Sequence, residues 1–234
     1  MKNRKRIGRL LSCFLLVCGV LLGLAACGNE KKPTEGLEFT LNEDGESYSL
    51  KGIGTATGTK IVIPAAYEGK PVTRIKPMAL INNQELTSVT LPESVTSIEF
   101  HAFSGCTGLT SITLSEGLTS IRVAAFSDCT GLTSITFPKS LTDIGSSAFG
   151  GCTGLRSVAL PKGVKYIASG AFSGCTGLTS VALPKGVKYI ASCAFYDCKG
   201  LTDVFYGGSA EDWAKIEIED GNDLLLSATI HYHS

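Results

Sequence analysis

The sequence has few of the residues that most enzymes use for acid–base chemistry, and it lacks the clusters that bind metal ions or nucleic acids. Only three histidines and one tryptophan occur among its 234 residues. No two of its nine cysteines have the Cys-x2-Cys spacing that is typical of structural zinc sites. Five of the 21 basic residues lie in positions 1–26, which leaves 16 basic against 21 acidic residues in the remainder. A mildly acidic body without clustered Lys and Arg gives no reason to expect nucleic-acid binding.

The same scarcity leaves no well-supported catalytic or metal site. Cys193 with His231 or His233 is a conceivable nucleophile–base pair, but no orienting acid or oxyanion feature accompanies it. His231 and His233 alternate on an expected strand and so share a face, yet two ligands without a third form a weak metal site. We therefore predict no catalytic residue, no metal and no cofactor.

The first 27 residues have the pattern of an export signal that ends in a lipid-attachment site. A basic start (residues 1–9) precedes an apolar run (residues 10–24), which is shorter than the roughly 20 residues that a transmembrane helix needs. The motif Leu-Ala-Ala-Cys that ends at Cys27 resembles the lipobox of bacterial lipoproteins. The resemblance implies cleavage after residue 26 and acylation of the Cys27 thiol. A permanent transmembrane helix and an ordinary secreted protein that is cut nearby are the alternatives.

Lipidation of Cys27 predicts a protein that is anchored on the cell membrane and faces outward. Two or more acyl chains hold a protein stably at a bilayer, where one chain does not. Residues 27–36 then comprise the lipidated Cys and a polar tether that contains Pro and Gly. The nine residues after Cys27 span at most about 30 Å, so the body should lie close to the membrane.

The strongest signal in the sequence is a repeat with a period of 23 residues. The Phe column of the repeat is Phe103, Phe126, Phe149, Phe172 and Phe195, and its Cys column is Cys106, Cys129, Cys152, Cys175 and Cys198. Leu86, Val89 and Ile75 begin three further apolar columns with the same step. A period of this length predicts a solenoid, because a unit so small buries its apolar face only against its neighbours.

One repeat, residues 109–131, predicts two short β stretches. Ile112 and Leu114 point to one face of the first stretch and Thr113 to the other. Leu118 and Ile121 then point inward on the second stretch. Which stretch forms the main sheet stays open at this point.

The repeat pattern Leu-x-x-Ile-x-Leu-Pro-x-x-Leu/Val-x-x-Ile-x-x-x-Ala-Phe-x-x-Cys resembles the BspA-like leucine-rich-repeat family. Residues 61–64 and 69–75 look like the typical first repeat of this family, and Ser115 and Gly207 depart from the pattern where the strand-ending Pro is expected. We predict a single right-handed, β-rich leucine-rich-repeat solenoid of about six coils of 23 residues each.

The domain prediction adds a cap at each end of the solenoid, because a terminal coil otherwise exposes apolar surface. The predicted parts are a signal peptide (residues 1–26), the lipidated Cys and tether (27–36), an N-terminal β cap (37–63), the repeats (64–206) and a C-terminal cap (207–234). Ser209 and Asp212 form a capping box that predicts a short helix. Residues 228–232 predict a final strand.

The Cys column is expected to be free, buried and structural, because free Cys is among the most buried residue types. Disulfides between neighbouring coils are the alternative. Cys193 lies outside the column. It falls where other repeats have His101, Ala124, Ser147 and Gly170. A plain packing residue, a semi-exposed thiol and a disulfide partner of Cys198 are its three interpretations.

Two surfaces are candidates for binding. The candidate polar face consists of the hydroxyl residues Thr110, Ser111, Thr113, Thr133, Ser134, Thr136, Thr179 and Ser180. The alternative explanation for this face is good β propensity and solubility. The candidate binding patch arises because residues 157–169 and 180–192 are identical, which stacks Lys162 on Lys185, Lys165 on Lys188 and Tyr166 on Tyr189. Such a cationic patch favours an anionic partner, and recent repeat duplication without selection for binding is the alternative.

The family resemblance implies adhesion or ligand binding at the cell surface. The expected partners are proteins or glycans, such as host matrix proteins or cell-wall polymers, and the membrane is contacted through the lipid on Cys27. A structural envelope scaffold or spacer without an external ligand is the alternative function.

Overall fold

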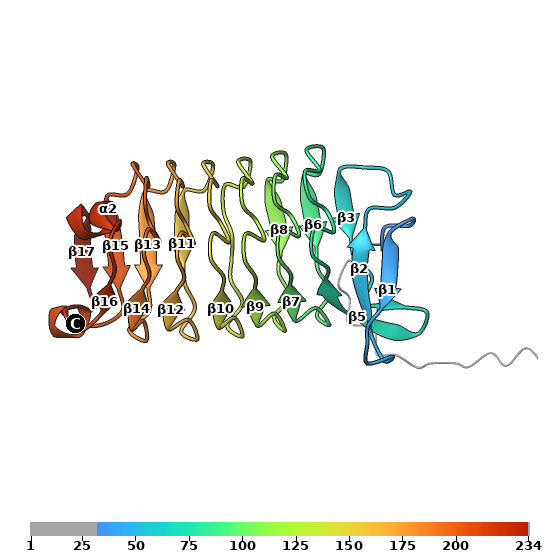
Figure 1. Cartoon of the computed structure of the whole chain (residues 1–234), viewed down its shortest axis with the longest axis horizontal. Coiled ribbons are helices and arrows are strands. Elements are labelled where there is room, and N and C mark those ends of the chain that lie inside the picture. Colours follow the sequence, from blue (N-terminus) through green and yellow to red (C-terminus); the bar gives the residue numbers. More distant parts are fainter. Residues whose placement is uncertain (1–31, 234) are drawn as a thin grey trace, which may run out of the picture. The chain divides into compact units, whose positions relative to one another are not determined.

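The computed structural model describes residues 32–233, which form a solenoid that carries a ladder of short parallel strands on each of two sides (Figure 1). The signal segment and Cys27 lie outside the described residues. Each side of the solenoid gathers one of the two β stretches of every repeat. The predicted β-rich leucine-rich-repeat solenoid is confirmed.

The first ladder is built from the Leu-x-x-Ile segments and consists of two sheets. One sheet contains β3 (Lys60–Val62), β6 (Ser88–Thr90) and β8 (Ser111–Thr113), and the other contains β11 (Ser157–Ala159), β13 (Ser180–Leu183), β15 (Asp203–Tyr206) and β17 (Thr229–Tyr232). Residues 132–138 continue the repeat between the two sheets without forming a strand. The interruption coincides with Phe137, which takes the place of Leu114 and packs edge-on against Phe149, with the ring centroids 5.6 Å apart.

The second ladder also consists of two sheets, which are divided between Ile144 and Tyr166. Its parallel strands are β2 (Tyr48–Gly52), β5 (Lys70–Ile75), β7 (Ser97–Ile98), β9 (Ser120–Ile121), β10 (Asp143–Ile144), β12 (Tyr166–Ile167), β14 (Tyr189–Ile190) and β16 (Glu217–Ile218). At its N-terminal end, β1 (Glu38–Leu41) pairs antiparallel with β2, and β4 (Ala66–Tyr67) pairs antiparallel with β5. The solenoid has about eight turns rather than six, because the segments on either side of the regular repeats also pair with the ladders.

The Phe and Cys columns form the core of the solenoid. Consecutive rings from Phe103 to Phe195 stack with centroids 5.1 to 5.5 Å apart. The five column cysteines are free and buried, as predicted. Each thiol donates a hydrogen bond to the carbonyl oxygen 26 residues earlier, at 3.0 Å for Cys106 to Leu80 and 3.1 Å for the others. Each cysteine therefore joins its own coil to the preceding one.

The position of Cys193 is a tight turn with left-handed backbone. The residues at this position in five consecutive coils, His101, Ala124, Ser147, Gly170 and Cys193, have φ between 52° and 63°. The residue types at this position differ because the turn requires a backbone conformation and not a particular side chain. Cys193 is free and half-buried, so the disulfide with Cys198 is wrong.

Ser115 departs from the family pattern for a visible reason. Its side chain is buried, and its hydroxyl donates to the Val95 carbonyl oxygen at 2.6 Å. A proline lacks such a donor, so the substitution adds a hydrogen bond between coils.

The C-terminal cap completes the last turn with two short helices, α1 (Ala210–Trp213) and α2 (Asp223–Ser227). The capping box of Ser209 and Asp212 is present at α1, as predicted. The buried Asn222 precedes α2, where its side chain accepts a hydrogen bond from the Phe195 amide and donates one to the Ala191 carbonyl, both at 3.0 Å. Asn222 thus provides hydrogen-bond partners for the Phe195 amide and the Ala191 carbonyl at the end of the regular repeats.

We predict that Gly154→Ala destabilises the solenoid by about 1–3 kcal/mol, the usual cost of overpacking. A Cβ at residue 154 would lie 2.4 Å from the Thr130 carbonyl oxygen and 3.1 Å from that of Leu132, so neighbouring coils would have to separate. Urea unfolding followed by circular dichroism measures the loss. Gly52→Ala is the control, because the nearest atom to its added Cβ is 3.6 Å away. Equal midpoints for both variants would contradict the prediction.

We also predict that Cys193 reacts with a thiol reagent at pH 8 in the folded body, whereas the five column cysteines do not. Burial raises the pKa of the Cys106 thiol to about 11 and that of Cys198 to about 12, and it raises the pKa of the other three thiols as well. Since the thiolate is the reactive form, these side chains stay inert until the chain unfolds. Peptide mapping after iodoacetamide treatment, with and without urea, checks this. Rapid labelling of Cys152 in the native protein would disprove it.

Candidate functional site

The candidate binding patch is assembled by β12, β14 and the turns that precede them. Tyr166 pairs with Tyr189 in register, and their rings stack with centroids 5.0 Å apart and planes 5° apart. Tyr166 is exposed, and so are all four lysines, Lys162, Lys165, Lys185 and Lys188. The structure therefore places the two phenols side by side on an open surface.

Two members of the patch interact with carboxylates of the C-terminal cap. The Lys185 ammonium lies 2.9 Å from an Asp212 oxygen, which raises the pKa of Lys185. The Tyr189 hydroxyl donates to Glu219, and this hydrogen bond raises the pKa of Tyr189 to about 12. Within residues 32–233, Lys162, Lys165 and Lys188 have no ion pair. Three ammonium groups, rather than four, are therefore available to an anion.

The candidate polar face lies on the first ladder, and all of its residues except the half-buried Ser180 are exposed. Some of its hydroxyls are already used within the solenoid. The Thr110 hydroxyl donates to the Thr87 carbonyl at 3.0 Å, and the Thr179 hydroxyl donates to the Arg156 carbonyl at 3.1 Å. Because these hydroxyl protons are already donated, the two hydroxyls can only accept hydrogen bonds from a ligand. This makes the face a weaker donor surface for sugars.

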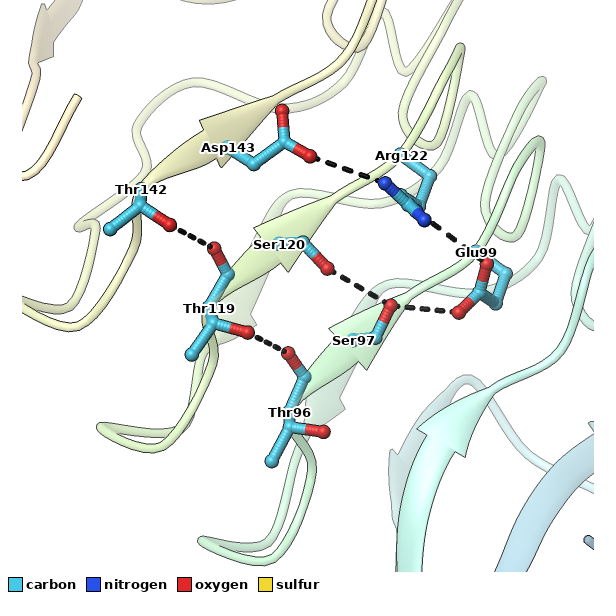
Figure 2. A network of polar contacts seen from close by, with 8 residues as sticks. All are labelled: Thr96, Ser97, Glu99, Thr119, Ser120, Arg122, Thr142 and Asp143. Carbon is cyan, nitrogen blue, oxygen red and sulfur yellow. Dashed lines mark hydrogen bonds and ion pairs between the residues drawn. The ribbon is translucent and has the colours of Figure 1, made fainter. Parts of the chain in front are cut away.

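The second ladder has a matching hydroxyl row that sequence reasoning did not identify (Figure 2). The Thr119 hydroxyl donates to the Thr96 carbonyl at 3.1 Å, and Thr142 donates to the Thr119 carbonyl at 3.4 Å. Ser120 donates to the Ser97 hydroxyl at 3.1 Å. These contacts connect three consecutive coils, so the row is a structural element.

A charged row lies beside these hydroxyls in Figure 2. Arg122 stands between Glu99 and Asp143, with nitrogen–oxygen distances of 4.0 and 3.3 Å. The Ser97 hydroxyl donates to Glu99 at 2.8 Å. Glu99 and Arg122 hold the same repeat position, whereas Asp143 holds the position of Ser120. The three charges form a surface network that is satisfied within the solenoid.

A concavity of about 330 Å³ lies at the C-terminal end of the first ladder. Its lining is Leu160, Lys162, Ala182, Leu183, Pro184, Phe205, Tyr206, Gly207, His231, Tyr232 and His233. The rings of Phe205 and His231 stack with centroids 4.7 Å apart. His231 also lies 2.7 Å from an Asp203 oxygen, and this contact lowers the pKa of Asp203. Sequence reasoning considered His231 only as a metal ligand or base and missed Phe205.

The conceivable Cys193–His231 pair is not assembled as a contact. The Cys193 sulfur accepts a hydrogen bond from Ser192 at 3.5 Å, whereas His231 contacts Asp203 and Phe205. Residues 32–233 contain no group of three or more His, Cys, Asp or Glu side chains that could hold a metal ion. None of the helices in this range is long and apolar enough to cross a bilayer.

Comparisons with known proteins identify the class of the repeats. Residues 73–202 match the BspA type leucine rich repeat region in six copies. The leucine-rich-repeat protein TpLRR of T. pallidum is 32% identical, with a TM-score of 0.70, over 87% of this chain and 98% of that one. The chain belongs to the BspA-type leucine-rich-repeat family.

More distant structures share the fold. A leucine-rich repeat protein from Bacteroides ovatus is 18% identical over 85% of this chain and 78% of that one, with a TM-score of 0.55. The pneumococcal vaccine antigen PcpA is 15% identical over 82% of this chain and 49% of that one, with a TM-score of 0.61. No curated protein matches the chain. Repeats of this family and fold typically serve in interactions rather than catalysis.

We predict that Arg122→Gln lowers the free energy of unfolding by less than about 1 kcal/mol, because exposed ion pairs contribute little. The effect should shrink further in 0.5 M NaCl, where surface charges are screened. Urea unfolding at two salt concentrations measures both quantities. A large, salt-independent loss would show that the charged row holds the coils together.

Proposed function

We propose that the protein is an outward-facing, lipid-anchored surface protein that binds protein or glycan partners through its leucine-rich-repeat body. The observation that carries the proposal is the candidate binding patch. A stacked tyrosine pair and three lysines that have no ion pair within residues 32–233 occur in two neighbouring coils of a body whose residues after position 26 are acidic in sum. The lipid on Cys27, supported by the lipobox-like motif, would hold this body at the cell surface.

The patch has the chemistry of a site for an anionic partner. Neighbouring coils lie about 4.8 Å apart, so lysines at the same repeat position repel one another until a negative group lies between them. Tyr166 adds a flat, amphipathic surface of the kind enriched at interfaces. An acidic polymer or an acidic protein surface that runs along the solenoid would contact Lys165 and Lys188 in succession.

A structural envelope scaffold is the second candidate. It is favoured by the hydroxyls of Thr110, Thr179, Thr119 and Thr142, which are used in joining coils. The predicted tether, in which Thr34 is already hydrogen-bonded to Val62 of the body, would also keep the body near the membrane. In that function the surface would need no external ligand.

We predict that the body binds at least one acidic member of a panel of fibronectin, fibrinogen, mucins, anionic glycans and cell-wall polymers. Changing Lys162, Lys165 and Lys188 together to Gln should weaken this binding at least tenfold and reduce its dependence on salt, because the ammonium groups contact the anion. Surface plasmon resonance at two salt concentrations measures both effects.

The matched control changes Lys60, Lys76 and Lys139 to Gln, which removes the same charge from coils on the N-terminal side of the patch. Binding that both triple variants retain would keep the binding function and place it on another surface. If no member of the panel binds, adhesion is refuted and the scaffold function is the better proposal. Labelling of the protein on intact cells, against cells with the wall removed, tests its exposure independently.

A further inference from the structure

We infer that the concavity beside Phe205 binds a single acidic sugar ring, such as a hexuronate, whose apolar face stacks on Phe205 and whose carboxylate reaches Lys162. The inference rests on the proposed binding function and names the ligand class of one site within it.

The first step of the argument is an uncovered aromatic face. Residues Ala182, Phe205 and His231 occupy the same position on β13, β15 and β17, where they pair in register, and Ala159 precedes them on β11. His231 covers one face of the Phe205 ring, while the neighbour on the other side is an alanine. Phe205 consequently stays 48% exposed despite its size. Neighbouring coils are about 4.8 Å apart. The space above the small Ala182 side chain therefore leaves room for one further ring, stacked on the uncovered face of Phe205.

The second step is that this aromatic wall is rigid. The His231 imidazole is held by Asp203 at 2.7 Å, and the Thr202 hydroxyl donates to the other Asp203 oxygen at 2.8 Å. The His231 ring on which Phe205 stacks is therefore positioned by hydrogen bonds before any ligand arrives. A preorganised wall reduces the entropy that a ligand loses on binding.

The third step is the charge of the lining. Among the residues that the structure describes, no Asp or Glu lines the concavity, whereas Lys162 and two histidines do. Asp203 lies close by, but His231 and Thr202 occupy its oxygens. Lys162 has no ion pair within residues 32–233. A ligand with one negative group is thus favoured over a neutral or cationic one.

The shape of the site favours a sugar ring over an aromatic group. Pockets for apolar ligands bury most of the ligand surface, and this concavity lies on an exposed sheet face, where only one face of a ring is covered. A pyranose presents weakly positive C–H bonds to the negative face of an aromatic ring. Its hydroxyls stay hydrated or reach the exposed Tyr232 and His233 at the rim.

The test uses the full chain in detergent micelles, with a galacturonate trisaccharide as the probe and the neutral galactose trisaccharide beside it. Isothermal titration calorimetry gives the affinities. We expect the acidic probe to bind at least tenfold more tightly than the neutral one. Phe205→Ala and Lys162→Gln should each weaken the acidic probe at least tenfold.

A further variant blocks the site without removing a side chain and so separates loss of binding from loss of the fold. In Ala182→Phe the new ring would occupy the place of the ligand and extend the aromatic stack, so binding should vanish while the urea midpoint stays unchanged or rises. Phe100→Ala is the matched aromatic control, because Phe100 is also 48% exposed and lies in a distant coil. Lys139→Gln is the lysine control, since it holds the position of Lys162 one coil earlier. Both controls should bind within twofold of the parent.

Any one of several results would overturn the inference. They are absence of galacturonate binding, equal binding of the neutral trisaccharide, and retention of binding by Ala182→Phe. Preferential binding of an acidic aromatic peptide at this site would also overturn it. If the panel ligand of the proposed function still binds in any of these cases, the failure concerns this site alone. If neither the panel nor galacturonate binds, the proposed function fails as well.

Discussion

The rest of the structure depends on one constraint, which is the parallel hydrogen bonding of each coil to the coil 23 residues before it. The pairing of Val158 with Val181 and of Val181 with Val204 shows the register. Once this register is set, each side chain stacks on its own equivalent about 4.8 Å away. Every repeat position must therefore hold a residue that is stable beside a copy of itself.

This constraint explains which residues the columns contain. Phenylalanine stacks on itself with parallel rings, and threonine donates to the backbone of the preceding coil. A cysteine thiol satisfies the carbonyl of the coil before it without adding bulk. Like charges at one repeat position repel one another, and the chain compensates for charged side chains in two ways. It places Arg122 between Glu99 of the preceding coil and Asp143 of the next, and it supplies Asp212 from the cap to neutralise Lys185.

Much of this could be predicted from the sequence, because a residue repeated at a fixed step has only one place in a solenoid. The Phe and Cys columns and the stacking of Tyr166 on Tyr189 follow from periodicity, and the free state of the column thiols follows from the burial typical of free cysteine. The contacts of Lys185 with Asp212 and of Tyr189 with Glu219 do not follow, since both carboxylates belong to a segment outside the repeat. The role of Asn222 escaped prediction for the same reason. The left-handed turn at Cys193 escaped because its residues share a backbone conformation and no side-chain chemistry.

The same constraint indicates where a binding site arises on such a molecule. A uniform column is self-satisfied, since each side chain already contacts its equivalents on both sides. A ligand needs a position where one coil offers a group that the next coil leaves uncovered. On the first ladder this occurs where Ala159, Ala182 and then Phe205 follow the threonines of the earlier coils at the same position. The face of the Phe205 ring that points toward Ala182 is therefore left uncovered. On the second ladder it occurs where Thr142 is succeeded by Lys165 and Lys188, neither of which has an ion pair in the described part of the chain. Both changes fall in the C-terminal coils, where the surface has departed furthest from the columns that stabilise the fold.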